Sequence, residues 1–141
     1  MVRRLGRDDL IARFRADRPM VLPSLLACDF AHLEDEIRAV EAAGAPALHL
    51  DVMDGHFVPN LSIGVPIVEA VRRVTNLPLD VHLMITNPVQ YIEPFRNAGA
   101  DSLTIHIEAV PEPQRLLDRI RSLGCLAGWC SMCLSAIAML I

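Results

Sequence analysis

The chain has 141 residues and a formal net charge of −4, with 52% hydrophobic and 21% charged residues. This length favours a single domain, and so high an apolar content excludes a disordered chain. The acidic balance argues against a nucleic-acid-binding protein, which would carry a basic surface.

Targeting and membrane signals are not visible in the sequence. No stretch reaches the roughly 20 apolar residues that cross a bilayer, and the charged residues 1–18 lack the apolar core of a signal peptide. The four cysteines have no regular spacing, which is typical of a reducing compartment. We therefore expect a cytoplasmic chain that binds neither nucleic acid nor membrane.

The expected elements begin with an N-terminal extension, residues 1–19, which is partly helical. Its helix spans residues 7–16 and is capped by Asp8. From Met20, short apolar runs alternate with amphipathic helical patterns. The expected strands are 21–26, 47–53, 79–85 and 102–108, with a fifth beginning at Leu126. The expected helices are 31–43, 66–74, a helix from Pro88 to near Gly99 with Asn87 as N-cap, and 113–122.

This alternation of strands and helices predicts an α/β fold with parallel strands covered by helices. The tripeptide Ala-Gly-Ala precedes two of the strands, at residues 43–45 and 98–100. This weak internal repeat favours a barrel or a doubly wound sheet over a solenoid.

Three of the expected strands carry one aliphatic and one polar face, because side chains alternate along a strand. The polar faces hold, strand by strand, His49, Asp51 and Met53; Asp80, His82 and Met84; and Thr104, His106 and Glu108. In a closed barrel these groups would converge inside. Burying them unpaired would be costly, so a metal, a ligand or mutual pairing should compensate.

His49, Asp51 and His82 are a candidate set of metal ligands. Two imidazoles and a carboxylate suit zinc, iron, manganese or cobalt, but the same residues also fit a hydrogen-bonded network without metal. Asp51 is either an acid/base that removes a proton beside a carbonyl or a structural metal ligand only.

The other polar-face residues carry weaker signals. Met53 and Met84 fit core packing better than cofactor contact. We expect His106 and Glu108 to pair with each other or with water. Ser24 is compatible with substrate contact, and residues 54–60 read as a loop after the second strand.

Five segments closely resemble the ribulose-phosphate 3-epimerase family. They are PSLLACDF (23–30), HLDVMDGHFVPN (49–60), DVHLM (80–84), AGAD (98–101) and HIE (106–108). The resemblance covers about Met20 to Gly128. It implies a (β/α)₈ TIM-type barrel, here truncated to roughly its first four to five βα units, over residues 20–128.

The resemblance also implies an activity, the interconversion of D-ribulose 5-phosphate and D-xylulose 5-phosphate in the pentose phosphate pathway. Inversion at C3 uses one aspartate on each face of the sugar. Asp51 matches the first aspartate, which accepts a proton and binds the metal, and His49 and His82 match two further metal ligands. Ser24, His82, Met53 and Met84 match positions that contact substrate. The expected cofactor is a divalent cation, Fe²⁺, Zn²⁺, Mn²⁺ or Co²⁺.

Residues 129–141 form an apolar tail that does not match the family. The resemblance assigns the second catalytic aspartate and the glycine-rich phosphate-binding loops to later strands, so we expect this chain to be inactive alone. The alternative function is a catalytically dead partial barrel, a truncated or frameshifted product with at most a binding role. Open sheet edges would then favour homo-oligomers or aggregation. The Cys130-x-x-Cys133 spacing, without a second pair, is a weak signal for zinc or redox chemistry.

Overall fold

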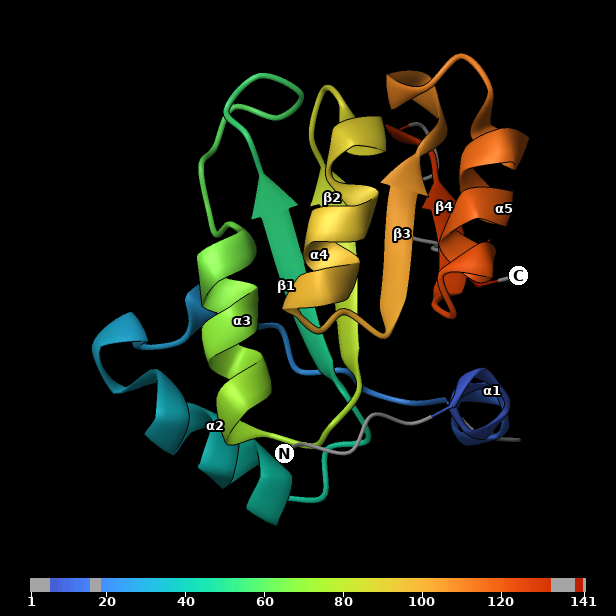
Figure 1. Cartoon of the computed structure of the whole chain (residues 1–141). Coiled ribbons are helices and arrows are strands. Elements are labelled where there is room, and N and C mark those ends of the chain that lie inside the picture. Colours follow the sequence, from blue (N-terminus) through green and yellow to red (C-terminus); the bar gives the residue numbers. More distant parts are fainter. Residues whose placement is uncertain (1–5, 16–18, 133–138, 141) are drawn as a thin grey trace.

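The computed structural model describes residues 6–15, 19–132 and 139–140. Its centre is a parallel sheet of four strands in the order β1-β2-β3-β4 (Figure 1). The strands are β1 (Leu48–Met53), β2 (Leu79–Met84), β3 (Ser102–His106) and β4 (Leu126–Cys130). Each strand pairs with its successor in the chain, as in a barrel wall, whereas a doubly wound sheet reverses its strand order. This arrangement confirms the predicted α/β fold and resolves the choice in favour of a partial barrel.

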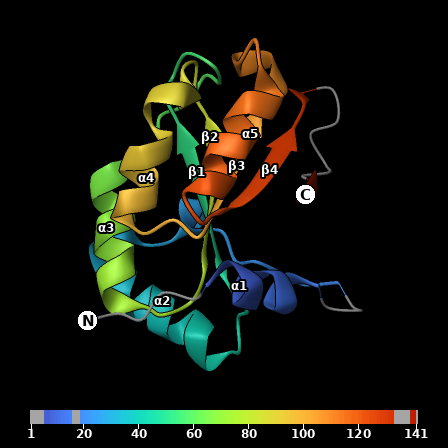
Figure 2. The same cartoon turned by 45° about the vertical axis from the view of Figure 1, so that its right-hand side comes forward.

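Five α-helices accompany the strands in the described part of the chain. They are α1 (Arg7–Phe14), α2 (Leu33–Ala42), α3 (Val65–Val74), α4 (Ile92–Ala98) and α5 (Pro113–Ser122). Helices α3, α4 and α5 cover one face of the sheet, and α1 lies below the N-terminal ends of β3 and β4 (Figures 1 and 2). None of these helices combines the length and the apolar content needed to cross a membrane.

The alternation predicted for the strands positions the core. In β1, the aliphatic Leu48, Leu50 and Val52 are buried, while the intervening side chains are only partly so. The aliphatic faces of β2 and β3 join them, together with Val68, Ile92, Phe95 and Ile120 from the helices. Each fully buried aliphatic side chain contributes about 2 kcal/mol. The opposite face of the sheet is therefore left to the polar side chains.

The predicted strand at 21–26 is wrong. The segment makes a single parallel bridge, from Ser24 to His49, and then turns into the 3₁₀ helix η1 (Leu25–Ala27). The Ser24 hydroxyl accepts a hydrogen bond from the Leu26 amide at 3.2 Å, which favours the turn over extension. Among the described residues the segment pairs with β1 alone, so it lacks the second neighbour that holds an inner strand.

Several element ends also differ from the sequence prediction. Asp8 does not cap α1, which starts after Gly6. Pro88 opens a 3₁₀ helix, η3 (Pro88–Gln90), and Asn87 makes no side-chain cap there. Strand β3 stops at His106, and Glu108 lies in η4 (Ile107–Ala109).

The outer edge of β4 carries an element that the sequence did not indicate. The two-residue strand β5 (Met139–Leu140) pairs antiparallel with Gly128 and Trp129. Strand β4 itself continues to Cys130, beyond the end of the resemblance at Gly128. The Cys130–Cys133 pair cannot be followed, since Cys133 lies outside the described residues.

A buried arginine joins α3 to the start of β3. Arg72 donates hydrogen bonds to Asp101 Oδ2 at 3.0 Å and to the Leu77 carbonyl at 2.8 Å. Asp101 Oδ2 also accepts from the Leu79 amide at 3.0 Å. The Arg72 side chain passes so close to Gly99 that an added Cβ there would lie 2.5 Å from Arg72 Cγ. Gly99 therefore has to be a glycine for this anchor to form.

Candidate functional site

Strands β1 and β2 bring three of the predicted site residues together on the polar face of the sheet. Asp51 on β1 is the direct partner of His82 on β2, and His49 lies two residues before Asp51 on the same face. All three side chains are partly buried. Side chains of paired residues in a parallel sheet point the same way, so the register itself aims these groups at one point.

The distances fit a cation. Asp51 Oδ1 lies 3.1 Å from His49 Nε2 and 3.3 Å from His82 Nδ1. One ligand atom from each of the three residues falls within 4.8 Å of the other two. Two nitrogens and one carboxylate oxygen are a donor set that Zn²⁺, Fe²⁺, Mn²⁺ and Co²⁺ accept. The residues present therefore fit the divalent metal that the sequence suggested.

Two further side chains orient this set. Asp80 Oδ2 lies 2.8 Å from His49 Nδ1, and a carboxylate in that position keeps the proton on Nδ1 and leaves Nε2 for a metal. The Ser24 hydroxyl donates to Asp51 Oδ2 at 2.7 Å, which leaves Oδ1 for the histidines. The single bridge between Ser24 and His49 holds the serine in reach.

The electrostatics favour an ionised Asp51. Burial would raise the pKa of Asp51, but hydrogen bonds from His49, His82 and Ser24 outweigh it and hold the pKa below its usual range. Burial would likewise lower the pKa of His49, yet its bonds to Asp51 and Asp80 prevail and raise it to about 10. A positive charge between these carboxylates is thus favoured, and a bound cation can supply it in place of the proton.

Met53 and Met84 are register partners at the C-terminal ends of β1 and β2, on the face that carries Asp51 and His82. Both are partly buried. Their placement one step further along the strands puts two apolar side chains beside the candidate metal ligands.

Strands β3 and β4 extend the polar cluster. His106 Nε2 lies 2.9 Å from His82 Nε2, and Cys130 Sγ lies 3.4 Å from the same nitrogen. His106 Nδ1 lies 3.8 Å from Glu108 Oε2, within the distance of an ion pair but too far for a hydrogen bond. Glu108 Oε1 instead accepts hydrogen bonds from Ser131 Oγ at 2.5 Å and from the Met132 amide at 2.9 Å. Burial raises the pKa of Cys130 to about 11, so without a cation it is a thiol.

Sequence comparison decides which family this fold and this cluster belong to. The sequence model of the Ribulose-phosphate 3 epimerase family matches residues 20–137. The chain belongs to this family.

Curated relatives of the epimerase family agree. The ribulose-phosphate 3-epimerase of Bacillus subtilis (strain 168) is 57% identical over 108 residues, which are 77% of this chain and 50% of that protein. The Mycobacterium tuberculosis (strain H37Rv) enzyme of the same name is 52% identical over 110 residues, 78% of this chain and 47% of the relative. The chloroplastic ribulose-5-phosphate-3-epimerase of Arabidopsis thaliana is 47% identical over 84% of this chain and 43% of its own length. The chain thus spans about half the length of the curated relatives it matches.

Asp54, in the family segment 49–60, ties two loops at the C-terminal ends of the strands. Its Oδ2 accepts from the Thr86 amide at 2.8 Å, and its Oδ1 accepts from the amides of His56 and Phe57 at 2.9 and 2.8 Å. Desolvation would raise the pKa of Asp54, but the hydrogen bond from the Thr86 hydroxyl and those from the three amides outweigh it and lower the pKa below its usual range. The sequence predicted only a loop at this position.

Asp54 therefore predicts a pH dependence of stability. A lowered folded-state pKa stabilises the fold above the unfolded value, about 3.9, and the contribution is lost as pH falls below it. Asp54→Asn should reduce the loss in urea midpoint between about pH 5 and about pH 3. The exposed Asp35→Asn on α2 is the control. An unchanged pH dependence in Asp54→Asn would contradict this role.

The sequence did not assign a role to Asp80, although its position two residues before His82 placed it on the polar face of the strand. Removing a carboxylate that orients a ligating histidine typically costs ~10–100-fold in metal affinity. We expect Asp80→Asn to weaken Mn²⁺ or Co²⁺ binding by this factor in a calorimetric titration. Asp118→Asn, the same chemical change on the exposed surface of α5, should leave the affinity unchanged.

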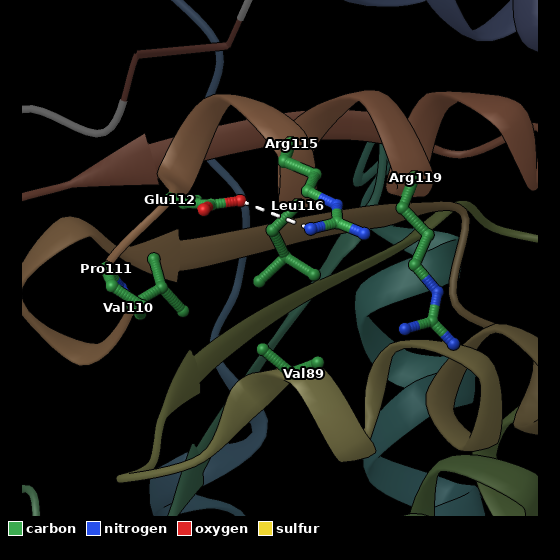
Figure 3. Close-up of a pocket in the computed structure, with 7 residues that line it drawn as sticks. All are labelled: Val89, Val110, Pro111, Glu112, Arg115, Leu116 and Arg119. Carbon is green, nitrogen blue, oxygen red and sulfur yellow. Dashed lines mark hydrogen bonds and ion pairs between the residues drawn. The ribbon is translucent and has the colours of Figure 1, made fainter.

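A cavity of about 500 Å³ lies elsewhere, between η3 and α5 on the helix-covered side (Figure 3). Its apolar wall includes Val89 and Leu116. Its arginines are paired with acids, Arg115 with Glu112 at 3.4 Å and Arg119 with Glu93 at 2.6 Å. The described residues that line it include no histidine, so it does not compete with the strand cluster as the candidate catalytic site.

Proposed function

We propose that this chain supplies the metal-binding half of a ribulose-phosphate 3-epimerase site, which interconverts D-ribulose 5-phosphate and D-xylulose 5-phosphate. The observation that carries the proposal is the convergence of His49, Asp51 and His82 on one point of the polar sheet face. The names of the relatives supply the substrate class.

Each residue has a proposed task. A divalent cation held by His49, Asp51 and His82 would supply positive charge beside the ketose oxygens and so make the C3 proton easier to remove. Asp51 accepts that proton, because its hydrogen bonds keep it ionised at neutral pH. Ser24 holds Asp51 in place and, with His82, contacts the sugar. Met53 and Met84 exclude water from one side of it.

Inversion at C3 needs a second acid/base on the opposite face of the sugar. Asp51 serves one face only, and the family resemblance assigns the second aspartate and the phosphate-binding loops to strands outside the matched segment. We therefore propose that the 141-residue chain binds the cation but does not invert its substrate alone. We also propose a cytoplasmic setting, because the described Cys28 and Cys130 are thiols.

A chimera tests the proposal. Residues 129–141 are replaced by the C-terminal half of the Bacillus subtilis relative, which shares 57% identity with this chain over the aligned segment. With Fe²⁺, Zn²⁺, Mn²⁺ or Co²⁺, the chimera should convert ribulose 5-phosphate to xylulose 5-phosphate, while the original chain should not. A folded, metal-loaded chimera without epimerase activity would overturn the proposed function. Turnover by the original chain would overturn its proposed inactivity alone.

A further inference from the structure

The polar face of the sheet holds a second group of potential metal ligands. His82 from β2, His106 from β3 and Cys130 from β4 each place one ligand atom within 4.8 Å of the other two. His106 and Cys130 are register partners at the C-terminal ends of β3 and β4, so the strand pairing fixes their separation. Both side chains are buried.

While both imidazoles are neutral, the protons of this group cannot all be placed favourably. His82 Nε2 and His106 Nε2 face each other at 2.9 Å, so one of them must carry the proton between them. If that proton is on His106, then His106 Nδ1 is a bare lone pair that faces Glu108 Oε2 at 3.8 Å. This buried Nδ1 has no hydrogen-bond partner among the described residues. If the proton is on His82, a neutral His82 turns a lone pair of Nδ1 toward the ionised Asp51 at 3.3 Å.

A cation resolves both conflicts. With a metal on the two Nε2 atoms, each histidine carries its proton on Nδ1. His82 then donates to Asp51 Oδ1, and His106 points its N–H toward Glu108. A carboxylate behind each ligating imidazole is the usual arrangement of a histidine metal site. Cys130 binds as a thiolate, and its proton passes to solvent.

The distances suit a tetrahedral ion. From the usual Zn–N and Zn–S bond lengths, two nitrogens on one zinc lie roughly 3.3 Å apart and a nitrogen and a sulfur roughly 3.6 Å apart. The separation between His82 Nε2 and Cys130 Sγ is 3.4 Å, and the two nitrogens need to move apart by only a few tenths of an ångström from 2.9 Å. Thiolate and imidazole together select a soft or borderline ion.

We propose that His82, His106 and Cys130 form a second cation site, specific for Zn²⁺ or Co²⁺ over Mn²⁺ and Mg²⁺. It differs from the first in its ligand atoms, since it uses Nε2 of His82 whereas the first faces Nδ1. A neutral imidazole offers only one of these nitrogens to a metal. Zinc at the second site therefore weakens cation binding at the first. The second site does not depend on the proposed function.

Cobalt added to the purified, reduced 141-residue chain gives the direct test. The chain should develop the intense near-ultraviolet absorption of a sulfur-to-cobalt charge transfer. Cys130→Ser should abolish it, because the Cys130 thiolate is the sulfur ligand of this site. Cys28→Ser and Cys133→Ser are the matched thiol controls, and both should keep the band.

Zinc affinity provides the second readout. Loss of a ligand should cost more than loss of an orienting group, so Cys130→Ser should weaken Zn²⁺ binding by over ~100-fold in competition with a chromophoric chelator. Absence of the charge-transfer band from the unmutated chain would overturn the proposal, and that measurement needs no variant to fold. So would a band that survives in Cys130→Ser.

Discussion

Asp51→Asn is expected to lower the turnover of the chimera by roughly 10³-fold, within the range that a positioned acid/base contributes. Asparagine keeps the size of the side chain and can still accept a hydrogen bond from Ser24, so the loss falls on proton transfer and metal charge. Steady-state kinetics at saturating metal measures it. Asp118→Asn on the exposed surface of α5 should retain full activity.

The metal and base roles of Asp51 can be separated. Metal content of Asp51→Asn is measured after dialysis, and exchange of the C3 proton is followed in deuterated water. A variant that keeps its cation through His49 and His82 but no longer exchanges the proton identifies Asp51 as the base. Retention of more than about a tenth of the turnover would contradict an acid/base role, whose loss costs at least ~10²-fold.

Gly99→Ala should have the largest effect on stability, about 3 kcal/mol. Gly99 has a φ of +126°, where an alanine is strained by about 1–2 kcal/mol. Its Cβ would also lie 2.5, 2.6 and 2.7 Å from Arg72 Cγ, Cδ and Cβ. Relief of that overlap requires movement of a buried arginine, and overpacking of this kind costs about 1–3 kcal/mol. Urea unfolding followed by circular dichroism measures the change.

Gly44→Ala is the matched control for this prediction. Gly44 follows α2 and also has a positive φ, +84°, but a Cβ there would meet no atom within 4 Å. Its substitution should therefore show the backbone strain alone, about 1 kcal/mol. Equal destabilisation in the two variants would show that the contact with Arg72 contributes nothing.

The sequence predicted the parts of the site that depend on local periodicity. His49 and Asp51 share a face because side chains alternate along β1, and their neighbours Leu48 and Leu50 had to face the helices. The pairing of Asp51 with His82 is different in kind. It depends on how β2 slides against β1, which tertiary packing determines. The polar strand faces could propose His82 for the same set, but they could not place it directly opposite Asp51.

The features that the sequence did not predict also depend on tertiary packing. Residues 21–26 are apolar enough for a strand, yet strand pairing needs neighbours, and Ser24 gave the segment a local alternative as a 3₁₀ cap. Asp54 and Thr86 are joined only because two loops meet at one end of the sheet. Cys130 becomes a neighbour of His82 across two strand pairings, a relation that no local pattern in the sequence reveals.

The direct pairing of Asp51 with His82 also bears on how the chain folds. A slip of β2 by one residue would turn His82 toward the helices and place Val81 or Leu83 opposite Asp51. Only the native alignment of the two strands assembles the ligands. Divalent ions should therefore bind the correctly aligned sheet in preference to slipped intermediates and raise the yield of native chain on refolding.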